Sequence, residues 1–329
     1  MSDIRIVIVG KIPPPIGGVT THVSRILTHL KRDGMTNVLL DLSKGFPLLW
    51  RNHLRNSDLI HLHTSNSLLR FLVALYCRLR KIPLVLTIHG DLGRFNWWGN
   101  LWDSWAVRLA TVPIVLNKGS FRKAIRWNAR AVQLSAFLPP LEEEKLSEAM
   151  TTAIKLMRYT HKSVFCTNGY SLSYDTQGNE VYGIFDLVAL FQELSEYALV
   201  ISDPSGTYAA YFREAGLVLP VNVSILEGPH PFIPVLKTCD VFIRATSTDG
   251  DSISVKEALF FGKLVIATNV VSRPQECLLY EPKDQDALAE RIRESHLRLG
   301  AHQVKMTINA EGLSCWQSLK MIYHALQGQ

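Results

Sequence analysis

The sequence predicts an α/β protein with two parallel sheets. Short apolar runs alternate with longer amphipathic stretches, first up to about residue 135 and again from about residue 164. Between the two series lie Pro139-Pro140 and a charged run from Glu142 to Lys145. Regular alternation of strands and helices is typical of parallel sheets, and 329 residues suffice for two domains of ordinary size.

Composition narrows the class of protein. Hydrophobic residues make up 47% and charged residues 19%, which is typical of a globular chain. The five cysteines contain no C-x-x-C pair, which favours a reducing compartment and argues against a zinc site built on cysteine. No apolar run approaches the roughly 20 residues of a membrane span, and the chain begins directly with a strand pattern, so we expect a cytoplasmic protein without a signal peptide.

The net charge of +6 fits anionic partners without choosing among them. No zinc-finger spacing, RNP-type motif or basic zipper occurs in the sequence, so we expect no nucleic-acid partner.

The first half opens with a strand, a glycine-containing loop at Gly17-Gly18 and a helix, which is typical of a nucleotide-binding α/β domain. The loop matches neither G-x-G-x-x-G nor a P-loop, and it can also be a flexible turn. The predicted strands are Ile4–Val9, Val38–Leu42, Leu59–His63, Leu84–Asp91, Thr111–Leu116 and Val132–Ser135, and the predicted helices are Thr20–Lys31 and Leu68–Leu79.

The second half repeats the alternation. Its predicted strands are Val164–Thr167, Tyr197–Ser202, Val223–Leu226, Val241–Ile243 and Leu264–Ala267, and its predicted helices are Phe185–Leu194, Tyr208–Ala215, Pro231–Thr238, Val255–Phe261 and Leu313–Leu326. The last of these carries an apolar stripe. We therefore expect one domain at 1–140, a linker at 141–161 and a second domain at 162–311.

A polar loop between the strand at Val241 and the helix ending before Gly262 is the strongest candidate site. Asp249 and Glu257 lie eight positions apart, the second in the expected first turn of the helix. Backbone N–H groups at a helix start, with carboxylates beside them, suit a ligand that is part diphosphate and part sugar. The residues of this loop that we expect to bind the ligand are Gly250, Asp251, Ser252, Ile253 and Ser254. Alternatively, Ser254 and Glu257 form an ordinary capping box and Asp249-Gly250 an ordinary turn.

Histidines fall at the carboxyl ends of two predicted strands of the first half. His63 ends one strand, and His89-Gly90-Asp91 ends the next. Because parallel strands end at the same sheet edge, these groups share one rim. We interpret His61 as a hydrogen-bonded sheet residue and His89 as functional, whereas either interpretation suits His63.

Four of the seven tryptophans lie between Phe95 and Trp105, and basic residues follow. Aromatic residues interleaved with cations suit an anionic membrane surface. The residues expected there are Trp97, Trp98, Arg122, Lys123 and Arg126. An alternative is an amphipathic helix whose tryptophans pack on the sheet, which we favour for Trp102 and Trp105.

Together these features resemble the retaining group 1 (family four) glycosyltransferases of GT-B fold. Asp249 and Glu257-Ala258 are similar to that group's acidic–seven residues–acidic signature, and Gly17-Gly18 and His89-Gly90 to its N-terminal loop and acceptor-side histidine. The resemblance implies two Rossmann-like domains facing across a cleft, with a last helix, 312–329, returning to the N-terminal domain.

For the site, the resemblance implies that Asp249 lies near the donor sugar hydroxyls and Glu257 on the nucleotide ribose. It further implies that Gly17 and Gly18 approach the diphosphate, and that His89, with His63 and Asp91, faces the acceptor. The group usually has an Arg and a Lys at places that correspond here to Gly169-Tyr170 and Tyr182-Gly183. Because a diphosphate needs donors or positive charge, Arg244 and Arg273 are the candidate replacements.

The function that the resemblance implies is retaining transfer of a hexose from a nucleotide sugar, UDP-linked by expectation, to a glycan or lipid-linked acceptor in bacterial surface polysaccharide biosynthesis. No metal ion or other cofactor is expected. Asp249, Glu257 and His89 are the expected catalytic residues, and the protein is expected to be cytoplasmic or peripheral on the inner face of the membrane. Two alternatives stay open: a nucleotide-sugar epimerase of GT-B fold, and a non-catalytic membrane-associated binding subunit.

Overall fold

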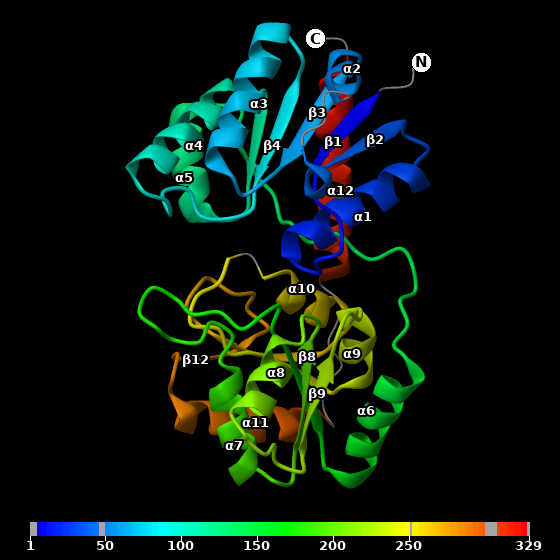
Figure 1. Ribbon diagram of the computed structural model, residues 1–329, viewed down its shortest axis with the longest axis vertical. Helices are drawn as coiled ribbons and strands as arrows, with labels where there is room; N and C mark the ends of the chain where they lie inside the picture. The colour runs from blue at the N-terminus through cyan, green and yellow to red at the C-terminus, as the bar shows by residue number, and fades with distance from the viewer. Residues whose placement is uncertain (1–4, 46–49, 251, 300–307, 328–329) are drawn as a thin grey trace. The chain divides into compact units, whose positions relative to one another are not determined.

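A computed structural model describes residues 5–45, 50–250, 252–299 and 308–327. Contacts divide the chain into an N-terminal unit, residues 1–141 with 310–329, and a C-terminal unit, residues 142–309. Each unit contains a six-stranded, fully parallel sheet with helices packed against it (Figure 1).

The N-terminal sheet has the strand order β2-β1-β3-β4-β5-β6. Its strands are β1 (Ile6–Gly10), β2 (Asn37–Asp41), β3 (Leu59–His63), β4 (Leu84–Ile88), β5 (Val112–Val115) and β6 (Val132–Gln133). The helices of this unit are α1 (Gly18–Arg32), α2 (Trp50–Arg55), α3 (Ser67–Arg80), α4 (Trp97–Leu109), α5 (Lys118–Trp127) and α12 (Ile308–Ala325), with a short 3-10 turn, η1 (Leu42–Lys44). The order reverses between β1 and β3, which makes their carboxyl ends a topological switch point, the place where such sheets bind ligands.

The C-terminal sheet has the order β12-β11-β10-β7-β8-β9, so its switch point lies between β7 and β10. Its strands are β7 (Val164–Asn168), β8 (Ala198–Asp203), β9 (Val223–Glu227), β10 (Val241–Arg244), β11 (Leu264–Thr268) and β12 (Leu278–Tyr280). Its helices are α6 (Glu148–Thr160), α7 (Ile184–Glu193), α8 (Thr207–Glu214), α9 (Phe232–Thr238), α10 (Ile253–Phe260) and α11 (Gln285–Arg298).

Every strand and helix predicted above is present, and most ends shift by one or two residues. The larger differences are that β4 ends at Ile88 and not at Asp91, and that α12 begins at Ile308 and not at Leu313. The structure adds elements that the sequence reading did not assign, among them α6 within the expected linker 141–161 and α11. Helix α6 buries Ile154 completely, and its Arg158 donates to the Thr238 carbonyl at 2.7 Å and pairs with Asp240 at 2.8 Å. Both added helices are rich in polar residues, so their apolar face is narrow and the sequence signal is weak.

The last helix, α12, packs on the N-terminal sheet, as expected. Trp316, Leu319, Tyr323 and Leu326 are buried in the cluster formed with β1, β3 and α1. Side-chain hydrogen bonds fix the helix: Trp316 Nε1 and Lys320 Nζ donate to Asp33 Oδ2 at 3.0 and 2.9 Å, and Tyr323 OH contacts His61 Nδ1 at 2.7 Å. Among the described residues, no helix is both long and apolar enough to cross a bilayer.

A buried ion pair joins α3 to α4. Arg70 Nη1 donates to both carboxylate oxygens of Asp103, at 2.8 and 3.0 Å, and each side chain is only 1% exposed. Arg70 Nε also donates to the Thr64 carbonyl at 2.8 Å, and Thr64 follows the last residue of β3. The pair therefore links two helices to the edge of the sheet where β3 ends.

Candidate functional site

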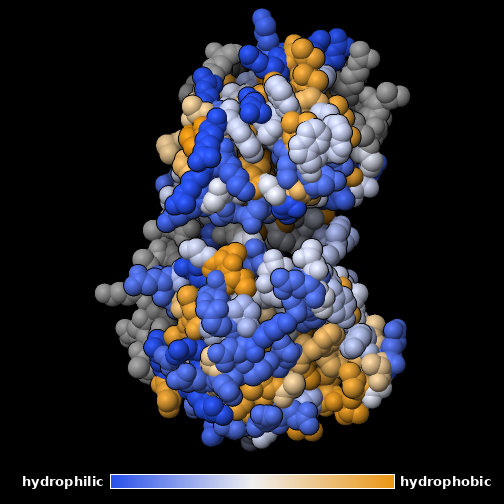
Figure 2. All heavy atoms as spheres, turned by 90° about the vertical axis from the view of Figure 1, so that its left-hand side faces the viewer, coloured by the Kyte–Doolittle hydropathy of each residue, from blue (hydrophilic) through white to orange (hydrophobic). Residues whose placement is uncertain are grey.

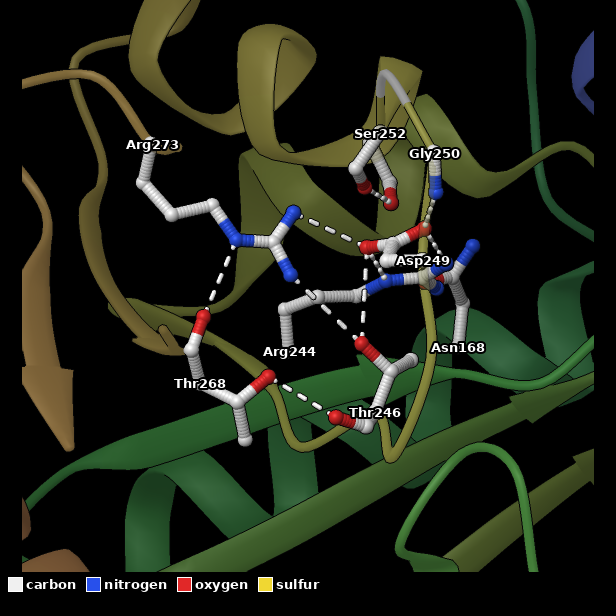
Figure 3. A network of polar contacts seen from close by, with 9 residues as sticks. Asn168, Arg244, Thr246, Asp249, Gly250, Ser252, Thr268 and Arg273 are labelled. Atoms are coloured by element: carbon white, nitrogen blue, oxygen red, sulfur yellow. Dashed lines mark hydrogen bonds and ion pairs between the residues drawn. The ribbon is translucent and has the colours of Figure 1, made fainter. Parts of the chain in front are cut away.

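The candidate donor site is a charged cluster at the carboxyl edge of the C-terminal sheet (Figure 3). Arg244 is the last residue of β10 and Asn168 the last residue of β7, so both lie at the switch point. Asp249 lies in the loop from β10 to α10, and Arg273 lies in the segment that follows β11. These side chains thus lie together at the carboxyl ends of three neighbouring strands, β11, β10 and β7.

Two arginines hold the Asp249 carboxylate. Arg244 binds it with two parallel hydrogen bonds, Nε to Oδ2 and Nη2 to Oδ1, both 3.0 Å long. Arg273 Nη1 donates to Oδ2 at 2.9 Å, and the Gly250 N–H donates to Oδ1 at 3.0 Å. The Asp249 side chain is 7% exposed. Burial on its own would raise the pKa of this carboxyl, but the charges and hydrogen bonds of the two arginines outweigh it and lower the pKa to about 2.

Other groups fix the guanidinium groups in turn. Arg273 Nε donates to the Thr268 carbonyl at 3.1 Å, and Arg244 Nη1 donates to Asn168 Oδ1 at 3.3 Å. The Arg244 guanidinium carbon also lies 5.3 Å from the centre of the Tyr182 ring. Two buried guanidinium groups against one carboxylate leave one formal positive charge, which suits an anionic ligand.

Helix α10 begins beside this cluster. Its N-cap is Ser252, whose side chain makes no capping hydrogen bond and instead lies 3.2 Å from the Ser254 hydroxyl. The first N–H groups of a helix have no partner within the helix, so Ile253 and Ser254 offer donors at its positive end. All three residues are buried.

The capping-box interpretation is wrong, because Ser252 and not Ser254 precedes the helix. Glu257 consequently lies in the second turn of α10 and not in its first, and it is 5% exposed. Asp251, named with the candidate donor residues, lies outside the described residues. Gly262, predicted to close the helix, does so with φ +68°.

Sequence reasoning missed a third carboxylate near this edge. Glu180 accepts hydrogen bonds from the backbone N–H groups of Tyr182, at 2.7 Å, and Ile184, at 2.6 Å, and a third from the Tyr208 hydroxyl. The start of helix α7 is therefore already occupied by an anion of the protein itself. That helix follows the two places where the glycosyltransferase group that the sequence resembles usually carries Arg and Lys. The start of α10 is therefore the better candidate to bind a diphosphate.

In the N-terminal unit the predicted histidines do meet. His63 ends β3 and His89 follows β4, and His63 Nδ1 lies 3.0 Å from His89 Nε2. Burial lowers the pKa of both rings well below the usual value, so both are neutral at pH 7. Asp91 accepts a hydrogen bond from Asn117 Nδ2 at 2.6 Å.

A histidine that the sequence reading passed over, His22 of α1, completes this group. Its ring centre lies 5.4 Å from that of His63 and 5.2 Å from that of His89. His61 has both ring nitrogens bonded, to Tyr323 OH at 2.7 Å and Thr87 Oγ1 at 2.8 Å, which confirms its interpretation as a satisfied sheet residue. Gly17 is the N-cap of α1 and Gly18 its first residue, so the helix starts two residues earlier than predicted.

The tryptophan segment forms helix α4. Trp97 and Trp98 are 67% and 59% exposed, and Arg122 and Arg126 are exposed on α5. Lys123 Nζ donates a hydrogen bond to the Leu92 carbonyl at 2.5 Å. Trp102 packs on Phe71 of helix α3, with ring centres 4.8 Å apart. Trp105 is 45% exposed, so the prediction that it packs on the sheet is wrong.

Neither a protein-family model nor a curated protein matches the chain in sequence. Solved structures match it over nearly its whole length. Anabaena HepE in complex with UDP is 15% identical with a TM-score of 0.67, over 98% of this chain and 100% of that one. WaaG, a glycosyltransferase involved in lipopolysaccharide biosynthesis, is 11% identical with a TM-score of 0.62, over 99% and 100%. The chain has the GT-B fold.

UDP-GlcNAc 2-epimerase from Neisseria meningitidis, bound to UDP-GlcNAc, also shares this GT-B fold. It is 12% identical with a TM-score of 0.60, over 98% of this chain and 100% of that one. At such identities the likeness is one of fold, so the reaction must be argued from the residues of the chain itself. The GT-B fold predicted from the acidic pair, the Gly-Gly loop and the histidines is confirmed.

Proposed function

We propose that this chain is a glycosyltransferase that takes a sugar from a nucleotide donor and transfers it to a hydroxyl group of a glycan or lipid-linked acceptor. The observation that carries the proposal is the Arg244–Asp249–Arg273 cluster beside the uncapped start of α10. Backbone donors and surplus positive charge at a switch point are what a diphosphate leaving group requires. The UDP bound to HepE, a protein of the same fold, favours a UDP-linked donor.

In this proposal each group of candidate residues has its own role. The arginines and the start of α10 neutralise the leaving diphosphate, Glu257 binds the ribose, and Asp249 orients the donor sugar from its arginine clamp. The neutral His89, with His63 and Asp91, positions the acceptor from the N-terminal unit. We further propose that the anomeric configuration is retained, that the transferred sugar is a hexose, that no metal ion binds the diphosphate, and that the product is a bacterial surface polysaccharide.

Binding of UDP to the purified chain is the first test. Calorimetry is expected to show one site, and Arg273→Gln is expected to weaken it by about 10- to 100-fold, since hydrogen bonds to charged groups are worth about 1.5–3 kcal/mol each. The matched control is Arg213→Gln, because Arg213 makes an exposed pair with Glu227 in the same unit. Absence of any heat with UDP, ADP, GDP or CDP would favour the non-catalytic binding subunit.

Because the chain shares its fold with an epimerase, epimerisation of a nucleotide sugar is the second candidate activity. An epimerase converts its nucleotide sugar without an acceptor, so incubation with UDP-GlcNAc alone separates the two proposals. A transferase is expected to leave the sugar configuration of UDP-GlcNAc unchanged, whereas appearance of the 2-epimer would favour the epimerase.

We also propose that helices α4 and α5 contact an anionic membrane surface. The side of the N-terminal unit on which Figure 1 draws α4 and α5 mixes hydrophilic with hydrophobic residues (Figure 2). The exposed Trp97 and Trp98 lie on α4, which neighbours the basic helix α5. Indole rings at the headgroup level and cations near anionic lipids are both favourable.

Sedimentation with vesicles rich in phosphatidylglycerol tests this contact. The double variant Trp97→Ser/Trp98→Ser is expected to bind about tenfold more weakly than the wild type, and raised salt is expected to release the wild type. Tyr159→Ser is the control, because Tyr159 is a 90% exposed aromatic residue of the C-terminal unit. Equal binding by all three proteins would refute the contact.

A further inference from the structure

Three histidines of the N-terminal unit converge at the switch point of its sheet. His22 comes from α1, His63 from the end of β3 and His89 from the residue after β4. One ring nitrogen of each can be chosen so that all three lie within 4.8 Å of one another. Among the described groups of histidine, cysteine, aspartate and glutamate, this is the set with metal-ligand spacing.

We propose that His22, His63 and His89 bind a divalent transition-metal ion, with Zn²⁺ as the best fit. Zinc accepts imidazole nitrogen at about 2.0–2.1 Å in a tetrahedral arrangement, which separates neighbouring ligand nitrogens by about 3.3 Å. His63 Nδ1 and His89 Nε2 already lie 3.0 Å apart. Because these two nitrogens share a hydrogen bond, one of them carries an N–H. Closing the site therefore requires that ring to change tautomer, together with small side-chain movements.

The protonation of His22 suits a metal. A neutral imidazole carries one N–H and one lone pair. His22 Nδ1 contacts the Ala136 carbonyl at 2.6 Å, a bond that requires the N–H on Nδ1 and leaves the lone pair on Nε2. A backbone carbonyl that holds the second nitrogen of a ligand histidine is a common support of metal sites, because it fixes both tautomer and ring orientation.

The surroundings also suit a buried ion. His63 is 1% exposed and His22 is 4% exposed. Three imidazoles without a carboxylate ligand favour zinc, copper or nickel over magnesium or calcium.

A three-histidine site leaves one tetrahedral position open, as in catalytic zinc sites. This inference does not rest on the proposed transfer reaction, because metal binding is measured directly. If both hold, the ion occupies two of the residues assigned to the acceptor, so Zn²⁺ is expected to change acceptor binding without changing the affinity for UDP.

Titration of the chelator-treated full chain with Co²⁺, which reports four-coordinate binding through its visible absorption, is the test. The wild type is expected to bind one equivalent and to release it to Zn²⁺. His22→Gln, His63→Gln and His89→Gln are each expected to weaken binding at least about tenfold, and the melting temperature without metal shows whether each variant is folded.

His230→Gln is the matched control, because His230 is also buried and hydrogen-bonded, to Ser202 Oγ at 2.8 Å and the Gly228 carbonyl at 2.7 Å, but in the C-terminal unit. Should the cluster variants unfold, X-ray absorption of the wild-type zinc complex still counts the imidazole ligands, and three are expected. No stoichiometric band in the wild type, an unchanged band in all three variants, an equal loss in His230→Gln, or fewer than three imidazoles would each overturn the proposal. UDP calorimetry on the same protein keeps this failure separate from that of the proposed function.

Discussion

Replacing Asp249 by asparagine is expected to abolish sugar transfer while UDP still binds. The change keeps the size of the side chain but removes the charge that Arg244 and Arg273 share. UDP then meets two uncompensated guanidinium groups, so its affinity is expected to stay the same or to rise. Turnover is expected to fall by about 100- to 1,000-fold, the usual effect of losing one preorganised polar group of an active site.

The measurements are UDP release from UDP-glucose and UDP calorimetry. Glu257→Gln is expected to lose turnover as well, but with weaker UDP binding, since Glu257 is assigned to the ribose. Asp240→Asn is the control, because Asp240 pairs with Arg158 just before β10 starts, at the opposite edge of the same sheet. Wild-type turnover in both Asp249→Asn and Glu257→Gln would show that Asp249 is only a structural counter-ion and would end the assignment.

The effect of Asp249→Asn on stability is expected to depend on pH. The pKa of Asp249 is lowered from 3.8 to about 2 in the folded chain, so its ion pairs stabilise the fold above pH 3.8 and lose that contribution as the pH falls toward 2. Asparagine cannot titrate. The difference in stability between wild type and Asp249→Asn is therefore expected to be largest near neutral pH and to shrink below pH 4, as acid denaturation curves of the two proteins would show.

Much of the fold could be predicted because the strands are short apolar runs with polar ends. β3 was predicted at Leu59–His63, the bounds that it has. The surface helices α6 and α11 could not be predicted, because their many exposed polar residues leave only a weak apolar periodicity in the sequence. Local patterns also named residues of the site, but they could not show which of them touch.

The contacts within the site depend on distant segments. Arg273 lies 24 residues from Asp249 and was singled out for its charge, not for this ion pair. His22 lies one helical turn after Gly18, and only the return of β3 and β4 to the same edge brings His63 and His89 beside it. A histidine on the first helix after a Gly-Gly loop is a signal that could have found it, because that helix start and the strand ends share one rim.

Removing the buried guanidinium of Arg70 is expected to cost the N-terminal unit about 3–5 kcal/mol. Arg70→Met fills a similar volume but leaves the Asp103 carboxylate buried without its partner. Burial raises the pKa of Asp103, and Arg70 is the main group that opposes this rise. Without Arg70 the pKa rises further, so the deficit is expected to shrink as the pH falls and Asp103 takes up a proton.

Thermal unfolding checks this expectation, with a fall of roughly 10 °C in the transition of the N-terminal unit. The double variant Arg70→Met/Asp103→Leu is expected to recover most of the loss, because replacing both members of a buried ion pair by apolar residues is often nearly neutral. Arg78→Met, an exposed arginine on the same helix, should stay within about 0.5 kcal/mol of the wild type. A double variant that melts as low as Arg70→Met would show that Arg70 acts through its bond to the Thr64 carbonyl, beside His63, and not through the ion pair.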